Sequence, residues 1–251
     1  MKKRILSILL LCCMVLTLLP TTVLAADGPM DTIPKYDVSI DVYNRTSDIS
    51  IKDSRSYYIY SSVPDKLRDT WAWDKKIFIK GDKTAPHVFI DGVNIEMSPS
   101  SKGPAIELNK KASAYIYFIG KNSSLQGADG RAAIQKNRSE GQLYVLARTG
   151  TTVTCKGGDK AAGIGGSYAT RNISNGYYNG DMYGHGVNMH FGSRSNPDYW
   201  GGTINATGGE YGAGIGAGSW GHSGHSGNTI HGGAGERLYF YSGTVNASGG
   251  R

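Results

Sequence analysis

The residues of this chain with the clearest capacity for chemistry are three carboxylates at equivalent places, namely Asp129, Asp159 and Glu210. Each lies five residues before an isoleucine that follows two small residues. If these segments stack on one another, the carboxylates lie along one edge, within reach of a calcium ion or as an acidic pair for glycoside hydrolysis. Ser101 takes the same place in the preceding segment, and Arg131 and Lys160 are basic neighbours. We therefore expect solvated turn residues, with a metal-binding or catalytic role as the alternative.

A second possible metal site lies in a glycine- and serine-rich stretch that contains His222, His225 and His231. A flexible loop with this spacing can fold around zinc, but structural zinc sites normally fix four ligands. No cysteine or nearby aspartate completes the set in this sequence. We expect histidines without a metal, and the sequence as a whole predicts no cofactor.

Aromatic residues in glycine-rich insertions suit carbohydrate binding. Two long insertions interrupt the later part of the chain, the first over residues 167–186 and 192–202 and the second over 219–236. Their candidate ligand-binding residues are Tyr177, Tyr178, Tyr183, Tyr199, Trp200 and Trp220. Tyrosine and tryptophan rings can stack on sugar faces while asparagine and serine side chains bond the hydroxyl groups. The alternative is that the rings fold back and seal the protein surface, and the sequence favours neither.

The elements that position these residues follow from an internal repeat of about 30 residues. Its first marker is an isoleucine behind two small residues, at Ile106, Ile134, Ile164 and Ile215. A second apolar anchor lies nine to eleven residues upstream, at Ile95, Leu125, Val153 and Ile204, and it recurs at Val245. We expect each set to form one stack that faces the core.

Period-two alternation of apolar residues indicates three short strands in every repeat. Val93, Ile95 and Met97 share one face of the first strand, and the second strand is the small-small-isoleucine segment. The third strand is rich in aromatic residues and spans 115–118, 143–146, 187–191 and 238–241 in successive repeats. Three strands and three turns in about 30 residues describe one coil of a parallel β-helix, an all-β solenoid with two long Gly/Tyr-rich loop insertions.

The N-terminus has the pattern of a secretory signal peptide over residues 1–25. Three basic residues precede an apolar run that extends to Leu19. A transmembrane anchor is the alternative, but the run is short and Pro20 interrupts it. Residues 26–87 then indicate an N-terminal cap with irregular first coils, and residues 88–251 the regular parallel β-helix repeats. We expect a secreted or cell-surface protein with no membrane span after cleavage.

Charge and cysteine content narrow the class of partner. The formal net charge of +7 becomes +4 once the three basic residues of the signal segment are removed. Nothing in this distribution suggests nucleic acid, and the small basic excess is weak support for anionic wall polymers.

Cys155 is the one cysteine outside the signal segment, and it takes the place of Ala206 and Ala247 in the repeat. We expect it to be a small buried core residue, and we expect no disulfide.

Glycine-rich runs in the later repeats resemble a known kind of protein. These runs span residues 152–158, 161–166, 203–209, 212–218 and 244–250. They resemble the right-handed parallel β-helix repeats of secreted and cell-surface proteins of Gram-positive bacteria, which are described as carbohydrate-binding or adhesin-like. The resemblance covers roughly residues 88–251. It implies a right-handed parallel β-helix, and it implies function only loosely because the shared residues are those that form corners.

Two functional classes follow from these features. The first is a non-catalytic structural or adhesive module that binds glycans or polymers of host and cell-wall surfaces. The alternative is a β-helix carbohydrate-active enzyme, a polysaccharide lyase or glycoside hydrolase, which needs two facing carboxylates in a cleft. The non-catalytic class is favoured because the repeat places the acidic residues on a turn edge.

The last repeat also breaks off after residues 244–250, so we expect a longer protein whose open C-terminal coil self-associates.

Overall fold

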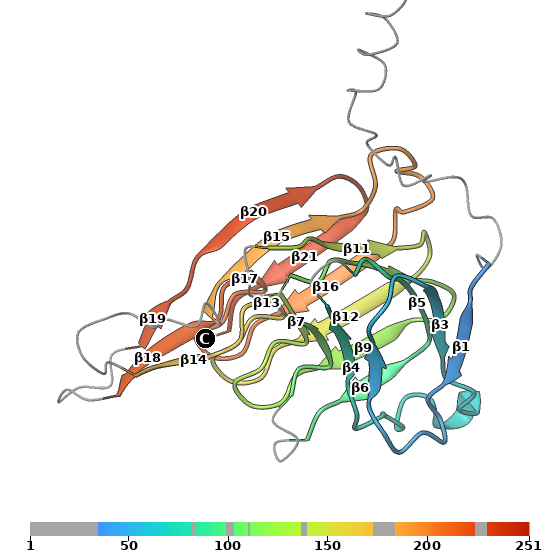
Figure 1. Ribbon diagram of the computed structural model, residues 1–251, viewed down its shortest axis with the longest axis horizontal. Coiled ribbons are helices and arrows are strands. Elements are labelled where there is room, and N and C mark those ends of the chain that lie inside the picture. Colours follow the sequence, from blue (N-terminus) through green and yellow to red (C-terminus); the bar gives the residue numbers. More distant parts are fainter. Residues whose placement is uncertain are drawn as a thin grey trace, which may run out of the picture.

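The computed structural model of this protein describes residues 35–81, 84–98, 103–109, 111–136, 140–172, 184–223 and 230–250. Within these ranges the chain forms a parallel β-helix whose coils stack along one axis (Figure 1). The predicted all-β parallel solenoid is therefore confirmed. The expected signal segment over residues 1–25 lies outside the described residues. In the described part of the chain, no helix has the length and apolarity needed to cross a bilayer.

Three parallel sheets form the walls of the solenoid. Sheet A contains, in order, β1 (Val38–Asp41), β3 (Ser56–Tyr60), β5 (His87–Asp91), β8 (Ala114–Phe118), β11 (Leu143–Ala147), β15 (Gly186–Phe191) and β20 (Gly235–Phe240). Sheet B contains β2 (Ile49–Ile51), β4 (Ile77–Lys80), β7 (Ile106–Asn109), β10 (Ile134–Gln135), β13 (Ile164–Gly165) and β17 (Ile215–Gly216). Sheet C contains β6 (Asn94–Glu96), β9 (Ser123–Gln126), β12 (Thr152–Lys156), β16 (Thr203–Thr207) and β21 (Thr244–Ser248). From β5 onward each complete coil visits sheet A, then C, then B, as the three-strand repeat predicted.

Residues 167–186 of the first insertion and residues 219–236 of the second connect sheet B to sheet A, and both contribute to a small fourth sheet, whereas residues 192–202 connect sheet A to sheet C. The fourth sheet contains β14 (Ala169–Asn172), β18 (Ser219–Ser223) and β19 (Ile230–Gly232). β14 pairs with β18 in parallel, and β18 pairs with β19 in the antiparallel direction. Part of each insertion is therefore a strand, because insertions at equivalent corners stack on one another as the coils do.

The first coils are less regular than the later ones. A segment with the 3-10 turn η1 (Asp65–Leu67) connects β3 to β4, and no sheet C strand lies there among the described residues. Trp73 instead forms a single parallel bridge to Ile95 of β6. Trp73 is buried, and its Nε1 donates a hydrogen bond to the carbonyl oxygen of Arg45 at 2.8 Å. This tryptophan thus closes the N-terminal edge of sheet C.

A column of isoleucines runs along the core side of sheet B. The predicted stack is confirmed by in-register pairing of Ile106, Ile134, Ile164 and Ile215. Ile49 and Ile77 extend the column by two further coils. Burying one isoleucine side chain contributes roughly 1.5–3 kcal/mol, so this column is a main source of stability.

The second apolar stack, in sheet C, differs from the expectation. Strand pairing places Leu125 beside Cys155, so Val153 and Ile204 lie in the neighbouring inward row and the predicted single stack is wrong. The cause is the corner after sheet C. Eleven residues separate Ile95 from the next marker isoleucine, whereas nine separate Leu125 from its own. Residues at equal distances before the marker isoleucine therefore belong to different inward rows in the first of these coils and in the later ones.

The predicted place of Cys155 in the repeat is confirmed, because it shares one column with Ala206 and Ala247. Its thiol is free and buried. Burial raises the pKa of the Cys155 thiol well above its ordinary value. The residue is a core side chain and not a reactive thiol.

Glycine is required where successive coils approach closely at the corner between sheets C and B. A Cβ atom at Gly209 would overlap the carbonyl oxygen of Gly158, and one at Gly250 would overlap that of Gly209. Any larger residue would push the coils apart at this corner. These glycines therefore have a structural role.

A lysine is buried in this solenoid directly after β10. Lys136 has an exposed fraction of 1%, and its Nζ donates a hydrogen bond to the carbonyl oxygen of Glu140 at 2.9 Å. Burial lowers the pKa of Lys136 to about 8, with a smaller upward effect of Glu140 and a smaller downward effect of Arg237. Below pH 8 the folded protein therefore carries a buried ammonium group. Stability rises between about pH 8 and the ordinary lysine pKa near 10.5, because there the unfolded chain binds more protons than the folded one.

Lys136→Met removes this buried charge and keeps most of the side-chain volume. We expect the unfolding free energy of the parent protein, relative to the variant, to increase by about 3 kcal/mol from pH 7 to pH 10.5. Urea denaturation of both proteins at the two pH values measures this change. Ionisation of the tyrosines affects both proteins alike and cancels in the difference. A difference that is independent of pH would show that Lys136 does not titrate in this way.

Candidate functional site

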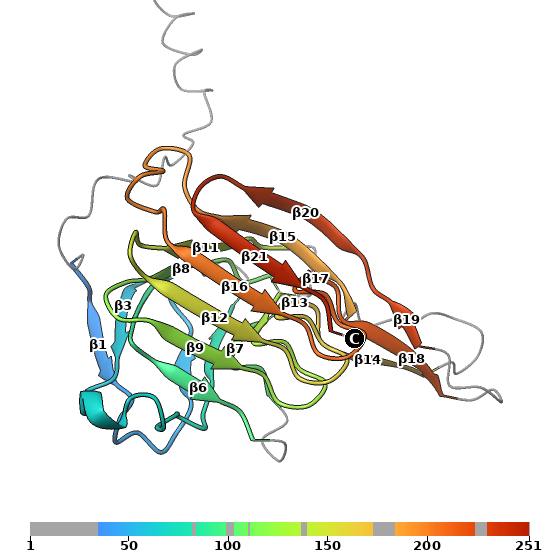
Figure 2. The ribbon, with the colours of Figure 1, turned by 180° about the vertical axis from the view of Figure 1, so that it is seen from behind.

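The outward side of sheet C carries polar side chains in register on five strands. In β12 the buried Val153 and Cys155 alternate with the exposed Thr154. The same outward position is occupied on successive strands by Asn94, Ser124, Thr154, Asn205 and Asn246. We call the outward side chains of sheet C the polar face, whose strands follow one another from β6 to β21 in Figure 2.

Two further polar rows flank this central row. One contains Thr152, Thr203 and Thr244, and the other contains Glu96, Gln126, Lys156, Thr207 and Ser248. Strands lie about 4.8 Å apart, and alternate residues of one strand lie about 6.6 Å apart, so the rows form a flat lattice. Hydrogen bonds between neighbouring side chains help to fix their positions. For example, Asn246 Nδ2 donates to Asn205 Oδ1 at 2.8 Å. The polar face is thus a regular array of hydroxyl and amide groups, with Glu96 and Lys156 as its charged members.

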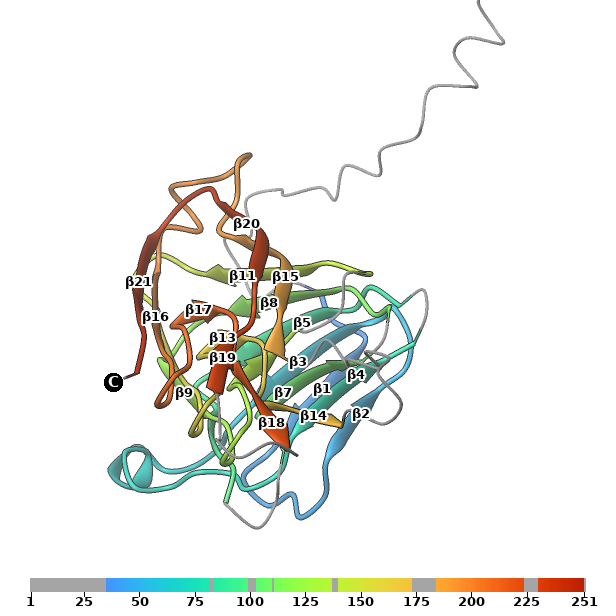
Figure 3. The same cartoon turned by 90° about the vertical axis from the view of Figure 1, so that its left-hand side faces the viewer.

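A wall stands at the N-terminal edge of the polar face. We call residues 61–73, which include η1, the wall loop. In Figure 3 its helical turn, in cyan, projects beyond the stacked strands of sheet C. The loop ends in backbone hydrogen bonds to β6, from Trp73 N to Asn94 O at 2.8 Å and from Glu96 N to Trp73 O at 3.0 Å. The wall and the floor of the site are therefore joined directly.

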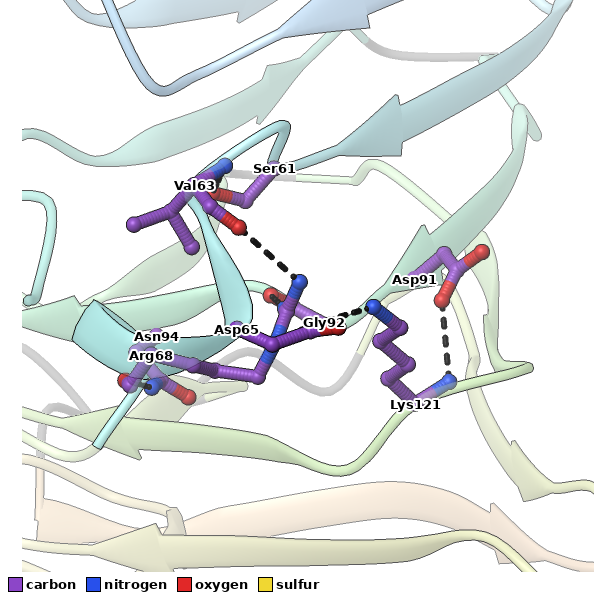
Figure 4. A network of polar contacts seen from close by, with 8 residues as sticks. All are labelled: Ser61, Val63, Asp65, Arg68, Asp91, Gly92, Asn94 and Lys121. Carbon is purple, nitrogen blue, oxygen red and sulfur yellow. Dashed lines mark hydrogen bonds and ion pairs between the residues drawn. The ribbon is translucent and has the colours of Figure 1, made fainter.

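Arg68 attaches the wall loop to the neighbouring coil (Figure 4). Its Nη1 donates to the carbonyl oxygen of Gly92 at 2.9 Å, and its Nη2 donates to that of Val63 at 3.3 Å. Asn94 Nδ2 donates in turn to the carbonyl oxygen of Arg68 at 2.9 Å. The Arg68 side chain is only 16% exposed. These charge-assisted contacts hold the wall in one position.

Ion pairs at the rim complete the network drawn in Figure 4. Lys121 Nζ lies 2.6 Å from Asp65 Oδ1, and this hydrogen bond is the main cause that lowers the pKa of Asp65. The backbone N–H of Lys121 donates to Asp91 Oδ1 at 2.9 Å. Such exposed pairs add little stability. Their effect here is that the charges of Asp65 and Lys121 offset each other beside the polar face.

The first of two grooves lies between the wall loop and the beginnings of β9 and β12. Its volume is about 610 Å³, and Ser124, Thr152 and Thr154 form part of its floor. Its charged lining residues are Asp65, Asp69, Arg68 and Lys121. Two acidic and two basic residues leave the first groove polar but without net charge. Its volume lies within the range of roughly 300–1,000 Å³ that is usual for small-molecule sites.

The second groove, of about 830 Å³, lies between the wall loop and the corner that leads from sheet C to sheet B. Asp129, Asp159 and Glu210 all line it, which confirms that these carboxylates share one edge. Hydrogen bonds from Gly130 N to Asp159 O at 2.9 Å and from Lys160 N to Glu210 O at 2.8 Å stack the three turns.

One carboxylate of this edge is paired with a base. Lys160 Nζ lies 3.0 Å from Asp159 Oδ2, and this hydrogen bond raises the pKa of Lys160. Among the described residues, no group of three or more His, Cys, Asp or Glu side chains is arranged to hold a metal. Ser101 lies outside the described residues. Because Glu96 also lines the second groove and Lys156 is its one basic lining residue, the groove has a net negative charge.

The outward side of sheet A carries a ladder of aromatic rings. Its five successive members are His87, Tyr115, Tyr144, His190 and Tyr239. Neighbouring ring centroids lie 4.4–4.7 Å apart, and neighbouring planes lie within 16° of parallel. The inner rings therefore cover each other's faces and present only their edges to solvent. Because sugars stack on ring faces, the ladder suits packing between coils better than carbohydrate binding.

Two of the candidate aromatic residues seal sheet A. Trp200 is 2% exposed and packs against Tyr117 with a centroid distance of 5.1 Å, in a cluster that includes Phe89 and Leu146. Tyr199 is partly exposed, contacts Trp200 edge-on at 4.8 Å and lies under the guanidinium of Arg148 at 5.3 Å. This segment thus folds over the outside of the solenoid, which corresponds to the sealing alternative.

The remaining candidates lie in the fourth sheet or beyond the described residues. Trp220 and His222 are in β18, and His231 of β19 pairs with Trp220. Tyr177, Tyr178, Tyr183 and His225 lie outside the described residues. The backbones of His222 and His231 therefore lie on adjacent strands, while the third member of the predicted set, His225, is not described.

The polar face was missed from the sequence, although a signal for it was present. Residues 152–156, 203–207 and 244–248 each place Thr, Asn, Ser or Lys at every second position, alternating with small or apolar residues. The glycine-rich residues that follow these strands indicate only the corners. The polar lattice is indicated by the outward residues of the strands, since equivalent strands of a repeat stack in register.

Comparison with protein-family models, curated proteins and solved structures finds no match for this chain. Its function is therefore proposed from the geometry of the grooves and of the polar face.

Truncation of Trp200 tests the sealing role. We expect Trp200→Ala to lower the free energy of unfolding by about 3 kcal/mol, because it opens a cavity over Tyr117. Tyr199→Ala should cost less than half as much, since that ring is partly exposed. Chemical denaturation of the two variants and the parent measures both effects. Unchanged stability of Trp200→Ala would remove the case for sealing.

Proposed function

We propose that this protein is a secreted or cell-surface, non-catalytic module that binds glycans through its polar face. The observation that carries the proposal is the in-register central row of Asn94, Ser124, Thr154, Asn205 and Asn246 between two further polar rows. Sugar hydroxyl groups both donate and accept hydrogen bonds, as do the hydroxyl and amide groups of this lattice. Side chains that are already fixed lose little freedom on binding, which favours affinity.

The charge distribution supports an uncharged ligand. The acidic and basic residues of the first groove are equal in number, and the second groove is negative. Polyanions such as nucleic acid require several unpaired Lys or Arg side chains along the path of the phosphates. Neither groove offers such a row among its lining residues. Neutral polysaccharides therefore suit this site better than the anionic wall polymers that the overall basic charge suggested.

A carbohydrate-active enzyme is the second candidate, and one observation favours it. Asp129, Asp159 and Glu210 line the second groove, beside the polar face. Two carboxylates that flank a bound sugar chain are the requirement for glycoside hydrolysis. The ion pair of Asp159 with Lys160 argues for a structural role of that carboxylate.

Binding to immobilised polysaccharides tests both candidates. The probes are neutral glucans, xylans and mannans, with polygalacturonate as the anionic comparison. We expect binding to neutral polymers only, and about a tenfold weaker affinity for Ser124→Ala/Thr154→Ala, which removes two hydrogen-bonding groups. Ser50→Ala/Asn109→Ala, on the outer side of sheet B, is the matched control and should bind as the parent does.

Three results would decide otherwise. Absence of binding to every neutral probe would refute glycan recognition. Equal weakening by the control pair would show that the polar face is not the site. Release of reducing ends or unsaturated uronides that stops in Asp159→Asn would establish the enzyme in place of the non-catalytic module.

A further inference from the structure

The first and second grooves lie next to each other on sheet C, and we call the two together the trough. Both are lined by the wall loop, the first by Asp65, Arg68 and Asp69 and the second by Thr70 and Ala72. They also share their floor. β9 supplies Ser124 to the first groove and Gln126 to the second, and β12 supplies Thr154 and Lys156 in the same way. Because alternate residues of a strand lie about 6.6 Å apart, the two grooves adjoin each other along the strand direction.

The direction of the trough follows from its wall. Neither groove is lined by residues 244–248 of β21, and the strand residues that do line them belong to the first three strands of sheet C, nearest the wall loop. The long axis of the trough therefore runs parallel to the strands, beside the wall loop. From residue 122 to residue 129 this path is roughly 20 Å long, which is enough for several linked sugars. Both ends lie at corners of the solenoid, where a chain can continue into solvent.

The trough offers hydrogen-bonding groups that the fold itself does not use. Asn122 Oδ1 accepts a hydrogen bond from Thr152 N at 2.8 Å, while its Nδ2 has no partner among the described residues. Ser124 and Thr154 are exposed on the floor of the first groove. Gln126 is half-buried in the second groove. These groups are placed to bond hydroxyls at intervals along the trough.

We propose that the trough binds an internal stretch of a linear, uncharged polysaccharide lengthwise, parallel to the strands of sheet C. This inference rests on the proposed glycan binding and adds the position, the direction and the charge class of the ligand. The wall loop, attached through Arg68, forms one side of the path. The carboxylates of the second groove exclude uronate chains by repulsion between like charges.

The test is a length series of neutral probes, from disaccharide to hexasaccharide, of the cello-, xylo- and manno-oligosaccharides. In calorimetric titrations we expect affinity to rise with length until the trough is filled. Asn122→Asp removes the free donor and keeps the acceptor for Thr152. It should weaken the binding of short and long probes about fivefold. Gln126→Ala should weaken binding of the hexasaccharide by a similar factor and leave binding of the disaccharide unchanged.

Two comparisons complete the test. Ser50→Ala/Asn109→Ala on sheet B is the control that should bind every probe as the parent does. Asn205→Asp, on the polar face but outside the trough, keeps the acceptor that Asn246 uses, removes the donor of Asn205, and should weaken the binding of every probe less than Asn122→Asp does. Equal weakening by Asn205→Asp and Asn122→Asp would mean that the ligand crosses the strands, which overturns the lengthwise path and leaves glycan binding intact. Tighter binding of oligogalacturonates than of neutral probes would overturn the charge class. A parent protein that binds none of the probes would refute the proposed function and this inference together.

Discussion

Each coil of this protein stacks on the preceding coil through parallel backbone hydrogen bonds, and this stacking constrains every position of the repeat. Strands about 4.8 Å apart leave room only for residues that pack against similar residues above and below. Ile106, Ile134 and Ile164 meet this condition in the core, and glycine meets it where the corner of one coil approaches the next. The aromatic ladder of sheet A meets it on the outside, with rings stacked face to face.

The same constraint underlies the proposed binding role of sheet C. A side chain on the outer side of a strand has an equivalent neighbour on each adjacent strand, so any outward residue type becomes a row. In sheet A these rows are aromatic, and neighbouring rings stack so that they cover each other's faces. In sheet C they are hydroxyl and amide groups, together with the charged Glu96 and Lys156, and these groups can form hydrogen bonds to a ligand. In the proposed binding mode the wall loop limits the ligand to the first strands of that face, and Arg68 holds the wall in place through its contact with the neighbouring coil.

Most of the fold could be predicted from the sequence, because the spacing of a repeat can be read without knowing which segments lie in contact. The isoleucine column, the aromatic strands and the shared edge of the three carboxylates all followed from spacing alone. The stack of Ile95, Leu125, Val153 and Ile204 did not, since the corner after Ile95 is two residues longer than later ones and spacing then misassigns the row. The site required tertiary information, because the wall loop has no counterpart in the repeat. Its contact with Asn94 and Lys121 joins residues far apart in the chain. Trp200 likewise seals Tyr117 across a long separation that no local pattern reveals.

We propose that the ligand binds on the outer side of sheet C beside the wall loop. The most direct test is the change in backbone amide chemical shifts when the protein is titrated with a neutral hexasaccharide. We expect shifts in the wall loop and in β6, β9 and β12, and none in β8 or β11 of sheet A. Shifts confined to sheet A or to residues 192–202 would contradict binding on sheet C.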